Sequence, residues 1–425
     1  MTDTIFALSS GAPPAAIGVI RISGPLAGAA LAALAGKLPA PRRAVLARLR
    51  DDAGELLDSA LVLWLPGPGT ATGEDCAELH CHGGRAVIAA VEAALAVSPG
   101  LRRAAPGEFT RRGFSNGVID LAEAEGLADL LTAETELQRR SAMALAGGAL
   151  SREVSAWREA LLGFSAQVEA VLDFADEDDV AALPPDFATR LAALAQAIGE
   201  WLSRPRAEVL KEGFRVVLAG PPNAGKSTLF NALVESEAAI TAPVAGTTRD
   251  VLTRPVAISG VPFLFADTAG LAESTEDTIE AIGIERARGE LARADLVLWL
   301  GAEGEGPPGA WEIEAQADRP DHTGKLAPRH RLSALTGQGM DALRADMVAT
   351  ARHALPRPGE AALNSRQHGL LAQAHAALLA AEGQGDLLIT AENLRLARLA
   401  FDSLLGHTTT ENMLDALFGR FCIGK

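Results

Sequence analysis

Residues Phe214 to Thr228 read FRVVLAGPPNAGKST, a short apolar run rich in β-branched residues that leads directly into a glycine-rich turn. The turn fits the pattern G-x-x-x-x-G-K-S and stands between a predicted strand and a predicted helix. In such loops backbone N–H groups surround phosphates, a lysine reaches the β- and γ-phosphates, and a serine hydroxyl ligates Mg²⁺. Lys226 and Ser227 occupy these two positions, so the stretch predicts a phosphate-binding site.

The residues after this loop alternate strand-like and helical patterns. PFLFAD (262–267), DLVLWLG (295–301) and HRLSAL (330–335) are short apolar runs separated by helical stretches. That alternation is typical of a parallel sheet flanked by helices. We therefore predict a separate α/β domain over residues 213–351.

The flanks of this domain have other patterns. Residues 119–212 and 352–425 are predicted to be helical, and one helix carries an apolar stripe at three- and four-residue spacing: Phe187, Leu191, Leu194, Ile198 and Trp201. Residues 1–118 alternate strand-like runs such as AIGVIRISG with alanine-rich helical runs such as AVIAAVEAALAV. The sequence therefore predicts an N-terminal α/β domain and a helical domain into which the phosphate-loop domain is inserted.

Composition limits the classes of function. A chain of 425 residues with a net charge of −16 is long enough for several cores and too acidic to coat nucleic acid by itself. Cys76, Cys81 and Cys422 are too few for a disulfide framework and favour a reducing compartment. Neither a secretory leader nor a run of about 20 apolar residues is present, so we expect a soluble cytoplasmic protein without a membrane segment.

Two further motifs extend the nucleotide site. AGTTRD (245–250) supplies Thr248 as a second Mg²⁺ hydroxyl, and FADTAG (265–270) places Asp267 at the metal-associated acid position. Taken in this order, the motifs resemble a translation-factor-type GTPase. That resemblance implies the following nucleotide-binding residues: Asn223, Ala224, Gly225, Lys226, Ser227, Thr228, Ala242, Pro243, Val244, Ala245, Gly246, Thr247, Thr248, Asp267, Thr268, Ala269, Gly270, Asp318, Ser333 and Ala334.

The base-recognition segment departs from this pattern. The GTPases carry Asn-Lys-x-Asp, whereas residues 315–318 here read AQAD, so Asp318 is retained and the amide and the lysine stem are absent. Asp318 can accept hydrogen bonds from the guanine N1–H and N2–H₂ groups. Losing one such polar contact costs about 1–3 kcal/mol, which leaves open how strongly the site prefers GTP to ATP.

Motifs outside the nucleotide site make the resemblance specific. GVIRISGP, TGEDCAELHCHGG, APGEFTRRGFSNGVIDLAEAEGLADLL, IGIERA and the final FCIGK are similar to the MnmE (TrmE) family of bacterial tRNA-modification GTPases over essentially the whole chain. The resemblance implies a folate-binding, dimerising N-terminal domain, a helical domain and an inserted GTPase domain. It implies a homodimer that joins an FAD-dependent flavoprotein, MnmG, in a heterotetramer.

The reaction implied by this family is modification of tRNA. An aminomethyl or carboxymethylaminomethyl group is added to C5 of the wobble uridine, and a 5-formyl or 5,10-methylene tetrahydrofolate derivative supplies one carbon. Two other functions stay open: a ribosome-assembly GTPase with unusual flanks, and a nucleotide-gated scaffold for another enzyme. The first is disfavoured because such proteins usually append a basic RNA-binding module.

The resemblance also implies folate contacts at Arg21, Glu78 and Lys425, because a guanidinium suits a carboxylate and an acid suits pterin N–H donors. A surface charge for Arg21 and a strand flank for Glu78 are the alternatives. Val118 stands where the family carries a lysine, so that contact is absent or replaced. His80-Cys81-His82 suggests zinc, but without a second paired cluster ordinary strand packing is favoured.

For hydrolysis, the resemblance implies K⁺ in the place of an arginine finger where two GTPase domains meet. Asn223 and Thr247 would contact K⁺, Val244 would contribute a backbone carbonyl, and Ala242 stands where a threonine is usual. Glu280 matches the acid that orients the attacking water, against the alternative of a solvent-facing helix residue.

The C-terminal Cys422-Ile423-Gly424-Lys425 has the outline of a prenylation box, but its last residue and the absence of a polybasic run argue against one. A spare buried thiol is a second reading. The family resemblance instead places Cys422 near the one-carbon unit as a catalytic candidate.

Overall fold

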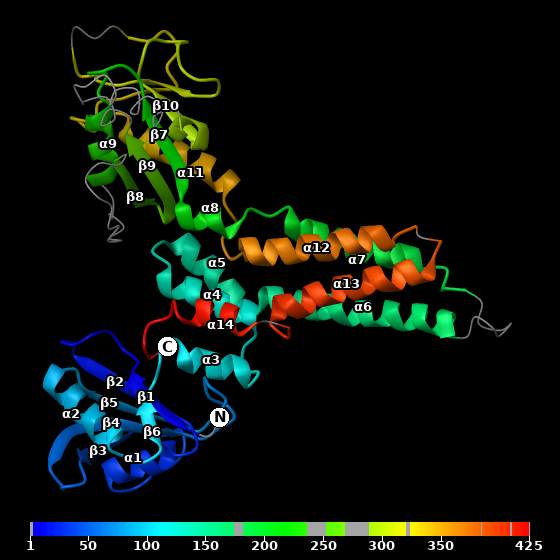
Figure 1. Cartoon of the computed structure of the whole chain (residues 1–425). Helices are drawn as coiled ribbons and strands as arrows, with labels where there is room; N and C mark the ends of the chain where they lie inside the picture. Colours follow the sequence, from blue (N-terminus) through cyan, green and yellow to red (C-terminus); the bar gives the residue numbers. More distant parts are fainter. Residues whose placement is uncertain are drawn as a thin grey trace, which may run out of the picture. The chain divides into compact units, whose positions relative to one another are not determined.

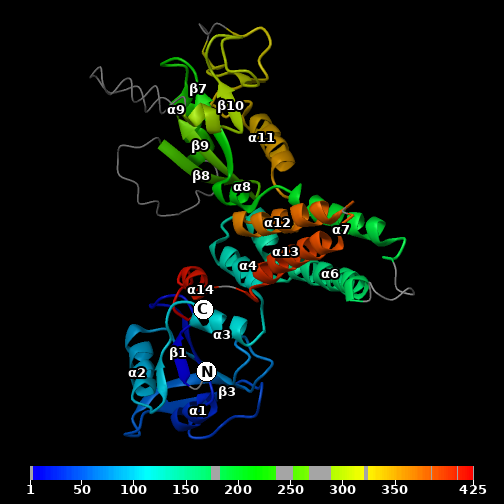
Figure 2. The same cartoon turned by 45° about the vertical axis from the view of Figure 1, so that its right-hand side comes forward.

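The computed structural model describes residues 3–173, 182–235, 252–267, 289–319, 324–383, 385–408 and 410–424. These residues form two compact units, one of Met1–Ala128 with Phe401–Lys425 and one of Asp129–Ala400. Figure 1 and Figure 2 show sheets flanked by helices and a set of long helices, as expected for a multidomain chain with α/β and all-α parts.

The first unit contains a six-stranded sheet with the strand order β3-β4-β5-β2-β1-β6. Only the β1–β6 pair is parallel, and the other neighbours are antiparallel. The strands are β1 (Thr4–Leu8), β2 (Ile17–Ser23), β3 (Val45–Arg50), β4 (Leu56–Leu65), β5 (Cys76–His82) and β6 (Leu101–Arg103). The predicted strands AIGVIRISG and SALVLWLPG form β2 and β4.

The two faces of this sheet differ because its strands alternate side chains between them. One face packs its apolar side chains, such as Ile20, Ile22 and Leu79, with those of α1 (Ala27–Ala35) and α2 (Arg85–Ala96) in one core. The intervening positions, including Arg21 and Glu78, point to the other face. There α3 (Glu108–Ser115) contributes Phe109 to a small core.

The C-terminal helix belongs to the same unit. In α14 (Glu411–Phe418) the side chains of Leu414 and Phe418 pack against α3 and the start of α4 (Leu121–Thr132). Arg111 on α3 also pairs with Glu411 and Asp415 on α14. The chain's last helix is therefore fixed to its N-terminal portion.

The second unit contains helices on both sides of its sheet in the sequence. Before the sheet come α5 (Glu136–Ala146), α6 (Ala149–Asp173), α7 (Phe187–Leu202) and α8 (Ala207–Glu212), and after it come α12 (Ser365–Ala381) and α13 (Leu387–Leu405). The last five residues of α13 fall in the first unit. Both views show α6, α7, α12 and α13 side by side (Figure 1, Figure 2). All five residues of the predicted stripe on α7 are buried. Helices from before and after the second sheet thus pack together.

The second sheet has the strand order β12-β11-β10-β7-β9-β8. Its strands are β7 (Phe214–Ala219), β8 (Leu252–Ile258), β9 (Val261–Asp267), β10 (Leu296–Trp299), β11 (Trp311–Glu314) and β12 (His330–Arg331), and its helices include α9 (Lys226–Glu235) and α11 (Met340–Ala354). The strands are parallel except β8, which runs antiparallel to β9.

The sheet is parallel as expected except at its edge strand β8, which is antiparallel. Ser259 and Gly260, with φ of 50° and 76°, connect β8 to β9 in a two-residue turn. Two left-handed residues in so short a connection form a hairpin, and a hairpin joins antiparallel strands. A parallel neighbour would need a crossover of a dozen or more residues.

Helix α5 is attached to this second sheet. Leu137 is buried in the same core as Val216 and Phe263, and its N–H donates to the carbonyl of Gly260 at 3.2 Å. The Gln138 side chain donates a hydrogen bond of 3.0 Å to the carbonyl of Leu210, which lies on α8. A helix that precedes the sheet by many residues therefore completes the sheet's core.

Candidate functional site

The phosphate loop runs from the end of β7 to the start of α9. Gly220 has φ of 149°, and a Cβ at that position would lie 2.9 Å from the backbone nitrogen of Gly301. Gly225 has φ of 90°. Both positions require glycine, since residues with a Cβ rarely adopt these backbone conformations. The loop leads into the N-terminus of α9, whose N–H groups and dipole favour an anion.

Lys226 lies inside this loop. Its side chain is buried, and Nζ donates to the carbonyl oxygens of Gly220 at 2.9 Å and Pro221 at 2.7 Å. Burial lowers the pKa of Lys226 below its usual value, while the charge of Asp267 opposes that change. A negative phosphate near Nζ would favour the protonated form in the same way as Asp267.

Ser227 and Asp267, the residues predicted to lie beside Mg²⁺, contact each other. Asp267 ends β9, where it is opposite Leu218 of β7, and its carboxylate is buried. The Ser227 hydroxyl donates to Asp267 Oδ2 at 2.8 Å. Hydroxyl and carboxylate oxygens are ligands that Mg²⁺ prefers, so this donor set fits the ion.

Two segments predicted to bind nucleotide, residues 315–318 and Ser333-Ala334, lie beside each other after β11 and β12. Ala317 N–H donates to the Leu332 carbonyl at 3.1 Å, which joins the AQAD segment to the strand end before Ser333. Ser333 is fully buried and Asp318 is exposed. Ala334 is partly buried against the core of the sheet. Asp318 and Ser333, both predicted to bind nucleotide, therefore stand in neighbouring segments.

Gln316 was not among the predicted site residues, yet it contacts the phosphate loop. Its Nε2 donates to the Asn223 carbonyl at 3.1 Å. Its position in the sequence could have identified it, since Gln316 stands where the Asn-Lys-x-Asp motif of GTPases has its lysine. Asn223 and Thr228 are exposed on the loop and on α9, and Ala224 is partly buried.

Several predicted residues lie outside the described residues. These are Ala242, Pro243, Val244, Ala245, Gly246, Thr247, Thr248, Thr268, Ala269, Gly270, Glu280 and Lys425. Their proposed roles in binding GTP, Mg²⁺, K⁺ and folate, and in orienting water, stay predictions.

A second constellation lies on the face of the first sheet that α1 and α2 do not cover. Arg21 on β2 is directly opposite Glu78 on β5. The guanidinium donates from Nε and Nη2 to Glu78 Oε1 at 3.1 and 2.9 Å, and His80 Nε2 lies 3.2 Å from Oε2. Burial raises the pKa of Glu78, but the bonds and charge of Arg21, aided by His80, outweigh it and hold the pKa below its usual value. Glu78 is therefore an ionised, half-buried acceptor.

A buried arginine connects the strands around this constellation. Arg112 of α3 is fully buried and bonds to Asp3 Oδ1 at 2.9 Å and to Glu74 Oε2 at 3.1 Å. Glu74 in turn accepts from the Ser23 hydroxyl at 2.7 Å, at the end of β2. Arg112 thus joins α3 to the strand that carries Arg21.

The C-terminal tail lies against the same unit. Ile423 forms an antiparallel bridge with Pro106, and Gly107 N–H lies 3.5 Å from the Cys422 carbonyl. Gly424 has φ of 94°, and a Cβ there would lie 2.0 Å from the carbonyl oxygen of Leu8. The structure therefore places exposed Cys422 in a tail that packs on β1, the neighbour of β2.

The other sequence candidates nearby have ordinary contacts. His82 Nδ1 lies 2.7 Å from Asp58 Oδ1, and in the described ranges no group of three His, Cys, Asp or Glu side chains could hold a metal ion. Burial raises the pKa of the Cys81 thiol to about 12, which makes it unreactive. Val118, which stands where the family carries a lysine, is exposed.

Comparisons with known proteins show which family the chain belongs to. The family description "GTP-binding protein TrmE N-terminus" matches residues 4–118, and "MnmE helical domain" matches residues 121–422. The tRNA modification GTPase MnmE of Erythrobacter litoralis (strain HTCC2594) is 66% identical over 423 residues, which span 100% of each chain. The chain belongs to the MnmE family of tRNA modification GTPases.

A second MnmE, from Novosphingobium aromaticivorans, is also 66% identical, over 437 residues and 100% of each chain. Among solved structures, the G domain of the T. maritima FeoB iron transporter is 25% identical, covers 32% of this chain and 98% of that chain, and has a TM-score of 0.24. As a member of the MnmE family, the chain is a GTP hydrolase built on a phosphate-loop fold. Within the described ranges, none of its helices combines the length and apolar character needed to cross a bilayer.

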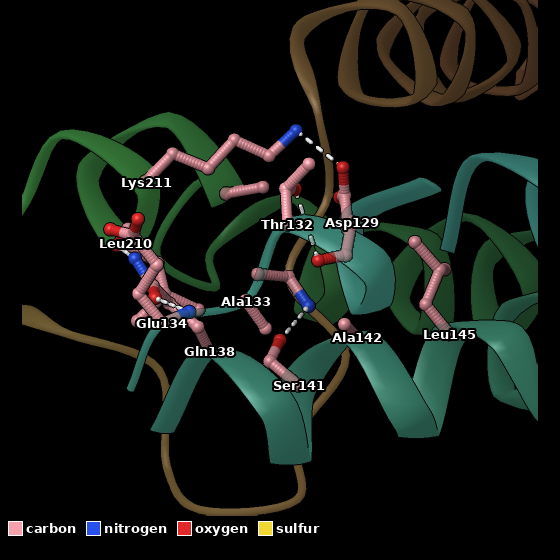
Figure 3. A pocket seen from close by; sticks show the side chains of 12 residues that line it. Asp129, Thr132, Ala133, Glu134, Gln138, Ser141, Ala142, Leu145, Leu210 and Lys211 are labelled. Carbon is pink, nitrogen blue, oxygen red and sulfur yellow. Dashed lines mark hydrogen bonds and ion pairs between the residues drawn. The ribbon is translucent and has the colours of Figure 1, made fainter. Parts of the chain in front are cut away.

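The second unit also has a cavity of about 290 Å³ between α5, α8 and the end of α4 (Figure 3). Lys211 Nζ lies 2.7 Å from Asp129 Oδ1 on its edge, and the Ser141 hydroxyl donates to the Glu360 carbonyl at 2.9 Å. Gln138 bonds to Leu210 within the same lining. These hydrogen bonds and the ion pair connect α4 and α5 with α8, which precedes the second sheet, and with Glu360, which follows it.

Proposed function

We propose that this protein hydrolyses GTP as part of a reaction that modifies C5 of the wobble uridine in certain tRNAs. With a FAD-dependent MnmG partner it would add an aminomethyl or carboxymethylaminomethyl group, one carbon coming from a 5-formyl or 5,10-methylene tetrahydrofolate derivative. The observation that carries the proposal is the Arg21–Glu78 pair in a unit that also holds the C-terminal tail. A phosphate loop alone would support any GTPase.

The folate would bind on the open face of the first sheet. Glu78 is ionised and can accept hydrogen bonds from pterin N–H groups, while Arg21 offers a planar cation to a carboxylate. Without a ligand the two side chains bind each other, so neither charge is buried without a partner. Both side chains face the surface on which the folate would bind. Lys425 is proposed as a further contact from its place at the end of the tail.

Hydrolysis would take place at the phosphate loop. Lys226 would bind the β- and γ-phosphates, and Ser227 with Thr248 would ligate Mg²⁺. The bound Mg²⁺ would neutralise the negative charge that develops on the phosphates. The Asn223 side chain, Thr247 and the Val244 carbonyl would hold K⁺. Glu280 would orient the attacking water. The Ser227 and Asp267 oxygens, 2.8 Å apart, support the Mg²⁺ assignment.

The assembly would be a homodimer joined to MnmG and tRNA, and a tRNA substrate implies the cytoplasm. The chain's net charge of −16 supports a division of labour in which the partner holds much of the RNA. Meeting of two GTPase domains would complete the K⁺ site.

The decisive experiment is mass analysis of wobble nucleosides from a strain that lacks the gene. We expect the modified uridines to disappear and to return with the wild-type gene, but not with Lys226→Ala or Asp267→Ala. Unchanged nucleosides in the deletion strain would overturn the proposal. Rescue by both variants would instead favour a scaffold that does not need the nucleotide.

Two further measurements separate the parts of the proposal. GTP turnover should be much faster in KCl than in NaCl, and equal rates would remove K⁺ from the mechanism. Cys422→Ser should keep GTP turnover and lose tRNA modification if the thiol takes part in the chemistry. If that variant keeps both, Cys422 has no chemical role.

A further inference from the structure

His80 contacts the oxygen of the Glu78 carboxylate that Arg21 does not bind. Arg21 Nε and Nη2 lie 3.1 and 2.9 Å from Glu78 Oε1, whereas His80 Nε2 lies 3.2 Å from Oε2. His80 and Glu78 are two positions apart on β5, so their side chains share one face of the sheet. The imidazole is 31% exposed and the carboxylate 18%. The pair therefore lies on the face that we propose as the folate site.

The charge of Glu78 decides which ring nitrogen of His80 carries a proton. An ionised carboxylate accepts hydrogen bonds and has no proton to donate. The contact therefore requires a proton on His80 Nε2, in the neutral as well as in the protonated ring. His80 is thus a donor to Glu78 in both forms of the imidazole.

The other side chains paired with these two strand positions are apolar. Val19 of β2 and Leu61 of β4 stand opposite His80, and Leu63 of β4 stands opposite Glu78. None of these three side chains can donate a hydrogen bond. Among the described residues paired with these two positions, the imidazole is therefore the donor that stays beside the carboxylate when the arginine turns away.

Arg21 and a pterin would compete for the same carboxylate. A carboxylate oxygen accepts about two hydrogen bonds, and both bonds from Arg21 go to Oε1 of Glu78. A pterin that offers two N–H donors side by side needs both oxygens of the carboxylate. Arg21 therefore has to turn from Glu78 before a pterin binds there. Its guanidinium also lies over the ring of Phe109, 5.9 Å from the ring centre.

We propose that His80 is a positioning residue of the folate site, which keeps the Glu78 carboxylate ionised and aligned while Arg21 binds the carboxylate of the folate. A half-buried carboxylate that loses every partner is driven towards its protonated form. The bond from His80 prevents this and occupies one acceptor position of Oε2, which leaves the other positions to the ligand. The inference rests on the proposed folate function.

The test compares His80→Leu, which removes the donor, with His80→Gln, whose amide nitrogen can replace the ring Nε2. The dissociation constant of 5-formyltetrahydrofolate is measured by calorimetry on the full chain. We expect His80→Leu to weaken binding about tenfold and His80→Gln to recover most of the loss. Tm and GTP turnover should stay near wild type, because Arg21 still pairs with Glu78 in the free protein. His353→Leu, at an exposed histidine of α11, is the matched control and should bind like wild type.

A second measurement needs no folate, since Arg21→Met imitates the arginine that has turned away. In that background His80→Leu should raise the equilibrium constant of unfolding in urea about fivefold, because Glu78 then loses its remaining charged or polar partner on the paired strands. In the wild-type background the same substitution should raise this constant less than about twofold.

Equal folate affinity in wild type and His80→Leu would overturn the proposal, as would a loss that His80→Gln does not recover. Equal effects of His80→Leu on unfolding in the two backgrounds would also contradict it. If wild type itself fails to bind the folate, the proposed folate site is wrong and the role of His80 falls with it.

Discussion

Ser227 Oγ lies 2.8 Å from Asp267 Oδ2, although 40 positions separate the two residues in the chain. Ser227 stands in the first turn of α9 and Asp267 at the end of β9, and parallel pairing of β7 with β9 brings these two ends together. The contact joins a hydroxyl to a buried carboxylate at the carboxyl edge of the sheet. In open α/β sheets this edge is where ligands bind.

Ser227→Ala should therefore reduce GTP turnover and raise the Mg²⁺ concentration needed for half-maximal rate. It removes the hydroxyl that we propose as a Mg²⁺ ligand and takes one donor from the Asp267 carboxylate, at a cost of about 1–3 kcal/mol. Turnover is measured over a Mg²⁺ titration. Ser203→Ala, at an exposed serine that follows α7, serves as the control, and an equal Mg²⁺ requirement in both variants would contradict the assignment.

Lys226→Met should separate stability from function. The ammonium is buried against two carbonyl oxygens and the pKa of Lys226 is lowered, so the fold gains little from its charge. We expect methionine to keep or raise Tm while GTP turnover is lost. Thermal unfolding and turnover are measured on the same preparation, and a large fall in Tm would show that the lysine is needed for folding.

Because of the Arg21–Glu78 pair, the free energy of unfolding should decrease as the pH falls into the acid range. Because the pKa of Glu78 lies below its ordinary value of about 4.3, its stabilising contribution is complete above that pH and is lost as pH falls through the lowered pKa. Arg21→Met should reduce stability at pH 7 by about 3 kcal/mol or less, since it leaves a half-buried carboxylate without its partner.

In the Arg21→Met protein only His80 opposes the effect of burial on Glu78, so the pKa of Glu78 should rise and the part of the acid-induced loss of stability that comes from Glu78 should disappear. The measurement is urea unfolding between pH 3 and pH 7. Arg395→Met, which breaks an exposed pair with Glu392 on α13, is the control and should change the profile far less. Superimposable profiles for wild type and Arg21→Met would rule out this account.

Gly424→Ala should displace the C-terminal tail. A Cβ there would lie 2.0 Å from the Leu8 carbonyl oxygen at a φ of 94°. We expect wobble-uridine modification to fall sharply while GTP turnover stays near wild type. Gly36→Ala has comparable backbone strain, with φ of 78° and no atom within 4 Å of its Cβ, and should keep both activities.

Leu137→Ala should destabilise the second unit by about 2–5 kcal/mol, because it opens a cavity in a packed core. Leu137 lies on α5 but is buried with the side chains of the second sheet. Thermal unfolding measures the effect. Leu326→Ala, at a side chain that is 97% exposed, should be neutral, and equal Tm values for the two variants would show that α5 adds nothing to that core.

Local patterns predicted much of this molecule. The run FRVVLAG became β7, the lysine after Gly225 began α9, and the stripe on α7 is buried as its spacing indicated. Asp267 was expected after a strand and ends β9. These features depend on neighbours within a few residues, so periodicity and turn chemistry suffice to predict them.

Other features could not be read from neighbouring residues. Gln316 contacts Asn223, Leu137 enters a core built mainly from residues after 209, and Arg112 meets Asp3 and Glu74. The hairpin of β8 and β9 was also missed, although its Ser259-Gly260 turn is local, because LTRPVAI has a weak strand pattern interrupted by proline.

By itself, the sequence determined the division into α/β and helical stretches, the phosphate loop and the motifs of the MnmE family, because each is encoded in short stretches of chain. Only the tertiary structure decided that Arg21 and Glu78 bind each other, that Lys226 is buried, and that Gln316 holds the Asn223 carbonyl. These contacts join residues brought together by strand pairing and core packing. The charge state and the orientation of a site residue depend on such neighbours, which no local pattern specifies.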